Sequence, residues 1–332
     1  MTHTRKVSRI LIEIGAMLLL AFGIKFVVHE PYLQGIVLNG ILFSIVALGL
    51  QLIMGYAGQI SLGQAAFVGI GAYTSVLMTK AGISFWLALP VAGLVAGLGG
   101  FLMSPIVRLA GVYFAMASLA FNISMSAVFS NWDAVTNATK GIIDIPFPTL
   151  GSITISSSGD FLTLSIIVIW LQWRVYQNIS NAGFGRVLRS IGDNETATIA
   201  AGVNTTVYKM KVIFVGCFMA GVAGAIMGHY KGIVSPEPFT IWQSIYFALM
   251  LVIGGLGNLR GAIIGAFALT FASEYIAAYA AQHRMLFYGI IMLLFMLFLP
   301  GGLDGILKRI LSVITPKFAK SARSDMSSME KS

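Results

Sequence analysis

The chain has 332 residues, of which 57% are hydrophobic and only 10% are charged. Soluble globular proteins carry about 25% charged residues, so this composition excludes a water-soluble domain and predicts an integral membrane protein. The net charge of +9 does not indicate a nucleic-acid partner, because the basic residues lie at predicted helix ends and in the two tails.

Apolar runs near the ~20 residues that span a bilayer recur along the chain. They lack the alternation of barrel strands, so each predicts a helix. The first run follows a basic stretch without a small-residue cleavage site, and we expect a retained helix, not a signal peptide. The predicted helices cover residues 10–28, 36–54, 65–78, 85–107, 112–129, 161–175, 210–230, 241–253, 262–281 and 285–299.

These runs predict an all-α, polytopic membrane bundle of about ten transmembrane helices. The third and eighth spans are short and bounded by glycine, which suggests two related five-helix halves with a path at their interface. The predicted domains are a cytoplasmic tail, a transmembrane domain and a disordered cytoplasmic tail. They cover residues 1–9, 10–307 and 308–332.

The distribution of basic residues predicts the orientation. A cytoplasmic N-terminus places 16 of the 21 Lys and Arg residues on the inner side, as the positive-inside rule requires. We therefore expect a multi-pass protein of the inner (plasma) membrane with both termini in the cytoplasm. Of the two long loops, residues 131–160 would lie outside and residues 179–209 inside.

A polar, glycine-rich break with the sequence GYAGQISLGQ occupies residues 55–64. Glycine lets the backbone leave helical geometry, and amides freed at the next helix start can bind a carboxylate. Irregular backbone at membrane depth is tolerated where it lines a cavity, whereas the alternative is an ordinary cytoplasmic hairpin. The predicted substrate path combines this break with polar residues inside spans: Gly58, Gln59, Ser61, Gly63, Gln64, Asn122 and Ser244.

Other polar residues inside spans are Asn39, Gln51 and Glu274. A polar side chain in lipid costs free energy, so each could face the path or form an interhelical hydrogen bond. A second glycine cluster at residues 254–261 predicts close helix packing through small-xxx-small spacing, as do the pairs Gly93 with Gly97 and Gly224 with Gly228.

Neither glycine cluster is followed by the Gly-Lys-Ser/Thr of a phosphate loop, so we expect no ATP site, and no other cofactor, in this chain. The four histidines and the single cysteine lack metal-ligand spacing. The inner loop, by contrast, is long and of mixed charge, and it predicts a short helix closed by Gly202. A solvated connector is the alternative.

From about residue 35 to residue 307 the chain resembles the permease subunits of branched-chain amino acid ABC importers, the Liv-type inner-membrane permeases. Gly254-Gly255-Leu256-Gly257 and Pro300-Gly301-Gly302-Leu303 contribute to the likeness. The other stretches that carry it are GYAGQISLG at 55–63, GVYFA at 111–115, DNE at 193–195, and His229 with Ser235-Pro236. Asn137 and Ala138 stand where the family usually has two glycines, and Ala262 replaces a frequent proline.

The resemblance implies a non-enzymatic subunit that passes leucine, isoleucine or valine inward. The implied partners are a second permease subunit, two ATP-binding subunits on the cytoplasmic side, which hold the ATP, and an external or periplasmic substrate-binding protein; membrane lipid surrounds the bundle. The ATPase subunits would dock on the inner loop, with Leu188 and Ile191 giving the apolar contact. The implied coupling residues are Arg186, Leu188, Arg189, Ile191, Asp193, Asn194, Glu195 and Gly202.

Two alternatives stay open. A permease of the same family could carry urea or short amides. A self-sufficient secondary transporter would need ion-coupling carboxylates of its own, and Glu13 and Glu274 are the acidic residues well inside predicted spans.

Overall fold

A computed structural model describes residues 30–103, 106–108, 111–151, 153–280 and 289–290. Helices dominate this part of the chain, and its only sheet is a hairpin of two-residue strands. The elements are α2 (Pro31–Leu50), η1 (Gln51–Tyr56), α3 (Gln64–Lys80), α4 (Phe85–Leu102), η2 (Ile106–Arg108), α5 (Val112–Asn131), α6 (Asp133–Thr136), η3 (Ala138–Lys140), β1 (Thr149–Leu150), β2 (Ile153–Thr154), α7 (Ser158–Asn181), α8 (Gly183–Asp193), α9 (Glu195–Ala200), α10 (Thr205–Lys231), η4 (Glu237–Phe239), α11 (Ile241–Gly254) and α12 (Leu259–Ala280).

The all-helical class is confirmed, and the predicted helices between 36 and 281 correspond to α2 with η1, α3, α4, α5, α7, α10, α11 and α12. Five described helices are long and apolar enough to cross a membrane: Pro31–Tyr56, Phe85–Leu102, Val112–Asn131, Thr205–Lys231 and Leu259–Ile276. The predicted helix 10–28 lies outside the described residues, as does 285–299 apart from 289–290. The count of ten and the two related halves stay predictions.

Local chemistry explains where several helices begin and end. Pro31 occupies the first turn of α2, where its fixed φ is already helical. Ser157 starts α7 because its side chain accepts a hydrogen bond from the Asp160 amide at 3.2 Å. α7 continues to Asn181, past the predicted end at 175, and α4 stops at Leu102 before the predicted 107.

The core is organised around α10, which packs against α2, α3 and α4. Glycine permits this close approach: a Cβ added at Gly224 would overlap the Val68 carbonyl, and one at Gly93 would lie 2.8 Å from the Phe218 ring. A Cβ at Gly254 would likewise overlap the Gly261 carbonyl, where α11 meets α12. These contacts confirm the predicted packing role of the glycine pairs.

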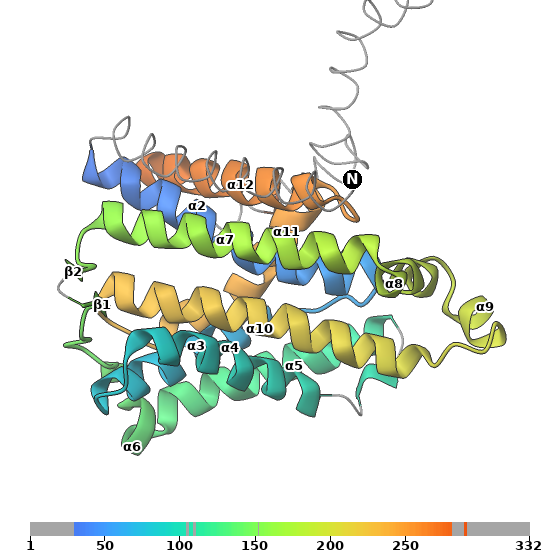
Figure 1. Ribbon diagram of the computed structural model, residues 1–332, viewed down its shortest axis with the longest axis horizontal. Coiled ribbons are helices and arrows are strands. Elements are labelled where there is room, and N and C mark those ends of the chain that lie inside the picture. Colours follow the sequence, from blue (N-terminus) through green and yellow to red (C-terminus); the bar gives the residue numbers. More distant parts are fainter. Residues whose placement is uncertain (1–29, 104–105, 109–110, 152, 281–288, 291–332) are drawn as a thin grey trace, which may run out of the picture.

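The two long loops lie at opposite ends of the bundle (Figure 1), with β1, β2 and α6 at one end and α8 and α9 at the other. The first loop is fixed to the helices: Ile142 and Val234 exchange backbone hydrogen bonds of 2.8 and 3.0 Å. The Trp86 indole donates to the Thr149 carbonyl at 2.8 Å. The predicted topology requires the loops to lie at opposite ends, whereas the assignment of the α8 end to the cytoplasm stays a prediction.

Candidate functional site

The predicted break is a real interruption of the helices. α2 ends in the π-helical turn η1, residues 57–63 have no helical structure, and α3 begins at Gln64. Gly58 has φ +64, a conformation that glycine adopts at little cost. π-helical turns are frequent at functional sites, so the geometry makes this segment a candidate for one.

Two serines from other helices accept hydrogen bonds from backbone amides at the start of α3. The first amides of a helix have no partner inside it, and Gly63 has no side chain to offer. The Ser118 hydroxyl of α5 accepts from the Leu62 amide, and the Ser244 hydroxyl of α11 accepts from the Ala65 amide, both at 2.9 Å. In this conformation the Leu62 and Ala65 amides are therefore hydrogen-bonded inside the chain, and the binding of a carboxylate at the start of α3 stays a prediction.

Ser244 also accepts a hydrogen bond from the Asn122 amide nitrogen at 3.1 Å. Gln64 donates from Nε2 to the Gly216 carbonyl at 3.1 Å. The structure therefore brings Gly63, Gln64, Asn122 and Ser244 together from three helices, all of them buried. We call the contacts of Ala65, Asn122 and Ser244 the Ser244 junction.

Three oxygens around the break are buried without a hydrogen-bond partner in the described structure: Gln59 Oε1, Gln64 Oε1 and Asn122 Oδ1. Burying an unpaired acceptor costs free energy. Acceptors of this kind can accept a hydrogen bond from a water molecule or from an ammonium group when the surrounding helices separate. Gln59 and Ser61 are themselves only 4% exposed, whereas Ile60 between them is 44% exposed, so the two polar side chains are covered in the described conformation.

The closed packing changes what a substitution at Gly63 would test. A bulky side chain there would be expected to block a passage if Gly63 faced one. A Cβ at this position instead lies 2.9 Å from the Ser118 backbone carbonyl. A leucine at Gly63 would thus force α3 away from α5.

The two glycine-rich segments meet, although they lie far apart in the sequence. Gln51 of η1 donates from Nε2 to the carbonyls of Gly255 and Asn258 at 3.3 and 3.1 Å. A Cβ at Gly55 would lie 2.7 Å from the Gly257 amide nitrogen. The sequence predicted only close packing for the second cluster, and the structure adds its direct contact with the first.

The inner loop forms two helices, α8 and α9, where we predicted one. They are separated at Asn194, whose side chain accepts from the Ala197 amide at 3.0 Å and starts the second helix. Gly202 has φ +84 just after α9, which agrees with its predicted place at a helix end.

The α8 helix contacts the break directly. A Cβ at Gly58 would lie 3.2 Å from the Gly192 Cα, and one at Gly192 would overlap the Tyr56 carbonyl oxygen. The Arg189 guanidinium lies over the Tyr56 ring at 5.0 Å from its centroid, within the range of a cation–π interaction. The Tyr56 hydroxyl and Ser180 Oγ share a hydrogen bond of 2.7 Å.

Six of the eight predicted coupling residues fall into two groups. Arg186, Arg189, Asp193 and Asn194 are exposed and are accessible to a partner. Leu188 and Ile191 are 0% and 3% exposed, because the apolar face of α8 packs onto its own bundle. The apolar contact that we expected these two residues to offer an ATPase is therefore used inside the chain.

Two residues near the beginning of α10 bind the Glu195 side chain. Its Oε1 lies 2.6 Å from Lys209 Nζ and accepts from the Thr205 hydroxyl at 3.0 Å. Lys209 is 1% exposed, whereas Glu195 is 28% exposed. We call Glu195, Thr205 and Lys209 the α9 clamp, because they hold α9 against α10.

Sequence reasoning missed the clamp and Tyr56, Ser118 and Gly192. A charged residue such as Lys209 close to an apolar run is a usable signal, since it needs a partner. The other three carry no such signal, because their importance depends on which residues face them across the fold.

The Ser244 junction gives a testable expectation. Replacing Ser244 with alanine leaves the Ala65 and Asn122 donors buried without an acceptor, at about 1–3 kcal/mol for each. We expect a clearly lowered melting temperature of the purified chain in detergent. Ser44 is the matched control, since it is equally buried but bonds only to Gly40 of its own helix. Equal effects of Ser44→Ala and Ser244→Ala would show that the junction contributes nothing particular.

The fold and this site define a multi-helix membrane protein. Its helices are long and apolar enough to span a membrane, buried polar side chains lie in an irregular segment between two of them, and a helical loop contacts that segment. Residues 32–297 match the family described as "Branched-chain amino acid transport system / permease component", and the chain belongs to this family. It is therefore a permease component and not an enzyme.

Three relatives illustrate the likeness. The chain is 30% identical to the high-affinity branched-chain amino acid transport system permease protein LivM of Salmonella typhimurium, over 87% of this chain and 73% of the relative. Identity to the Escherichia coli LivM is 29% over the same shares. A probable branched-chain amino acid transport permease protein LivH of Methanocaldococcus jannaschii is 27% identical over 86% of this chain and 96% of its own length. No solved structure matches the chain significantly.

Proposed function

We propose that the chain is the membrane-spanning permease subunit of an ATP-driven importer for branched-chain amino acids. It would work in the inner membrane with a second permease, two ATP-binding subunits on the α8 side and a substrate-binding protein outside. ATP would be bound by the partner subunits. The relatives named for branched-chain amino acid transport support the substrate class.

The observation that carries this proposal is the contact between α8 and the break. A partner that moves α8 would act on residues 57–63 through the Gly58–Gly192 backbone contact and the Tyr56–Arg189 stacking. The loop also leaves Arg186, Asp193 and Asn194 exposed at the end of the bundle. Exposed charges at an interface rim fix orientation more than they add affinity, which suits a docking surface.

The experiment joins copurification with uptake. The full chain is purified from native membranes with its bound subunits, and cells lacking the chain are assayed for uptake of labelled leucine and urea. We expect two ATP-binding subunits and a second permease in the purified complex, and loss of leucine uptake that the intact chain restores. Restored urea uptake with unchanged leucine uptake would assign the chain to amides. Uptake by the purified chain alone in vesicles would contradict ATP-driven import.

The orientation has its own test. We expect an impermeant thiol reagent on intact cells to label Ser156→Cys but not Thr196→Cys, in a Cys217→Ser background. Both positions are exposed, at opposite ends of the bundle, and Cys217 is buried. Labelling should reverse in inside-out vesicles. Labelling of position 196 alone on intact cells would invert the topology.

A further inference from the structure

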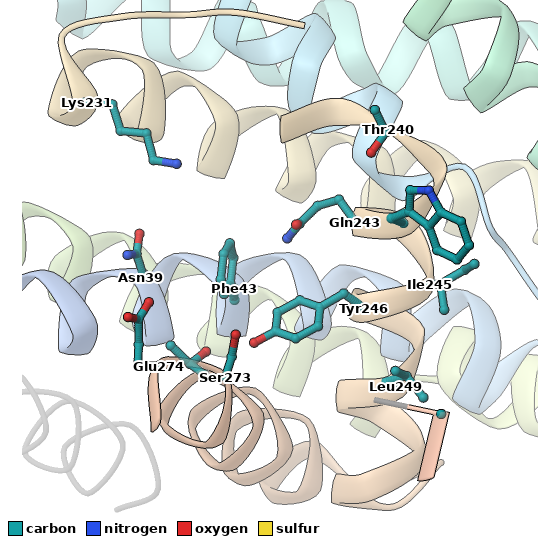
Figure 2. Close-up of a pocket in the computed structure, with 13 residues that line it drawn as sticks. Asn39, Phe43, Lys231, Thr240, Gln243, Ile245, Tyr246, Leu249, Ser273 and Glu274 are labelled. Atoms are coloured by element: carbon teal, nitrogen blue, oxygen red, sulfur yellow. The ribbon is translucent and has the colours of Figure 1, made fainter. Parts of the chain in front are cut away.

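A cavity of about 480 Å³ opens between α2, α11 and α12, near the end of α10. Its volume is in the range of about 300–1,000 Å³ that small-molecule sites occupy. None of the predicted path residues lines it, although Asn39 and Glu274 were noted among the polar residues inside spans. Figure 2 shows its lining side chains, which come mostly from α2, α10, α11 and α12. Ser244 of α11 is not among the lining residues.

The charged and polar groups of the cavity are divided between two sides. Figure 2 shows the Lys231 ammonium and the Gln243 amide pointing into the open space, with Asn39 and Glu274 grouped near its other edge. In the described part of the chain, no carboxylate pairs with Lys231. Among the described residues, none offers a hydrogen bond to the buried Asn39 Oδ1, and the Tyr32 hydroxyl donates to the Glu274 carboxylate at a long 3.4 Å.

A cation and an anion that do not pair with each other can together bind a ligand that carries both an anionic and a cationic group. Lys231 would attract a carboxylate, whereas Glu274 and Asn39 Oδ1 would accept hydrogen bonds from an ammonium. Glu274 is half-buried within α12, whereas Lys231 is exposed at the end of α10. An ionisable residue within a membrane-spanning helix costs free energy, and it usually marks a path or a site. The rest of the lining combines apolar or aromatic side chains with three hydroxyl groups: Phe43, Trp242, Ile245, Tyr246 and Leu249, with Thr240, Thr270 and Ser273.

We propose that this cavity binds a zwitterionic amino acid with an aliphatic side chain. Lys231 holds the carboxylate, Glu274 and Asn39 hold the ammonium, and the apolar lining covers the side chain. The assignment rests on the proposed function and names the residues that recognise its substrate. A phosphatidylethanolamine headgroup has the same pair of charges, so the experiment must separate a free amino acid from a lipid.

The test measures equilibrium binding of labelled leucine to the purified full chain in lipid nanodiscs. Two competitors each lack one charge: 3-methylbutylamine has no carboxylate, and 4-methylpentanoate has no ammonium. A hydrogen bond to a charged group contributes about 10- to 100-fold in affinity, so leucine should outcompete both by at least about tenfold.

Each variant should lose discrimination against one analogue. Lys231→Met should weaken leucine about tenfold and leave 3-methylbutylamine unchanged, so that the two bind alike. Glu274→Gln should weaken leucine about tenfold and leave 4-methylpentanoate unchanged, so that these two bind alike. Retained binding with altered discrimination cannot come from misfolding. Lys140→Met and Glu237→Gln, at exposed positions outside the cavity, should leave all three affinities unchanged.

Three results would overturn the assignment. These are no saturable leucine binding up to about 10 mM, unchanged discrimination in both variants, and leucine binding that fails while phosphatidylethanolamine alone stabilises the chain. The third result would make the occupant a lipid. Leucine uptake by cells with the intact system is measured in parallel. If uptake is normal while leucine binding does not respond to the cavity variants, the assignment of the cavity is rejected and the proposed function is not.

Discussion

Replacing Glu195 with glutamine is expected to destabilise the inner loop more than replacing Lys209 with methionine. Removing one partner of a buried ion pair leaves an uncompensated charge, at about 3–5 kcal/mol. Lys209 is 1% exposed and cannot recover hydration, whereas Glu195 is 28% exposed and can. Hydrogen–deuterium exchange of the α9 amides should therefore accelerate most in Glu195→Gln.

In the double variant Glu195→Gln/Lys209→Met, the exchange rate of the α9 amides should be nearer to that of the intact chain than in Glu195→Gln alone, because no charge remains buried. Lys211→Met is the matched control, since Lys211 is exposed two positions along α10. Strictly additive effects of the two single changes would contradict the α9 clamp. A charge reversal at Glu195 disrupts this clamp as well as a partner's contact, so it cannot test docking alone.

The helices were predictable because each depends on a local property. A membrane-spanning helix needs only a long apolar run, and the runs of α4, α5 and α10 have few interruptions. The break was also predictable, since Gly58 and Gly63 enclose polar residues between two apolar segments. The predicted role of this break as a substrate path stays a prediction.

Contacts between distant segments were not predictable in the same way. Leu188 and Ile191 have the spacing of one apolar helical face, and that spacing does not say whether the face covers a partner or the same chain. Serines that complete another helix, such as Ser118 and Ser244, look like any polar residue within an apolar run. The cavity needs residues from four helices, and only the assembled fold shows that Lys231 and Glu274 line one space.

Replacing Gly192 with valine is expected to separate α8 from the break and to lower uptake at least about tenfold, which corresponds to about 1.4 kcal/mol. A Cβ at this position overlaps the Tyr56 carbonyl oxygen and lies 3.4 Å from the Gly58 amide. The neighbouring backbone cannot move aside without shifting the break itself. Overpacking of this kind typically costs about 1–3 kcal/mol, which a multi-helix bundle can survive.

The matched control is Gly183→Ala in the first turn of the same helix, where the nearest atom to an added Cβ is the end of Arg186 at 3.7 Å. It should leave uptake unchanged. On the proposed function, the Gly192→Val complex should still bind its ATP-binding subunits, because the exposed residues Arg186 and Asp193 are unaltered. The measured quantity is leucine taken up per ATP hydrolysed in reconstituted vesicles. A lowered ratio with intact assembly means that movement of α8 reaches the break through this backbone contact, whereas a normal ratio means that the contact only packs the loop.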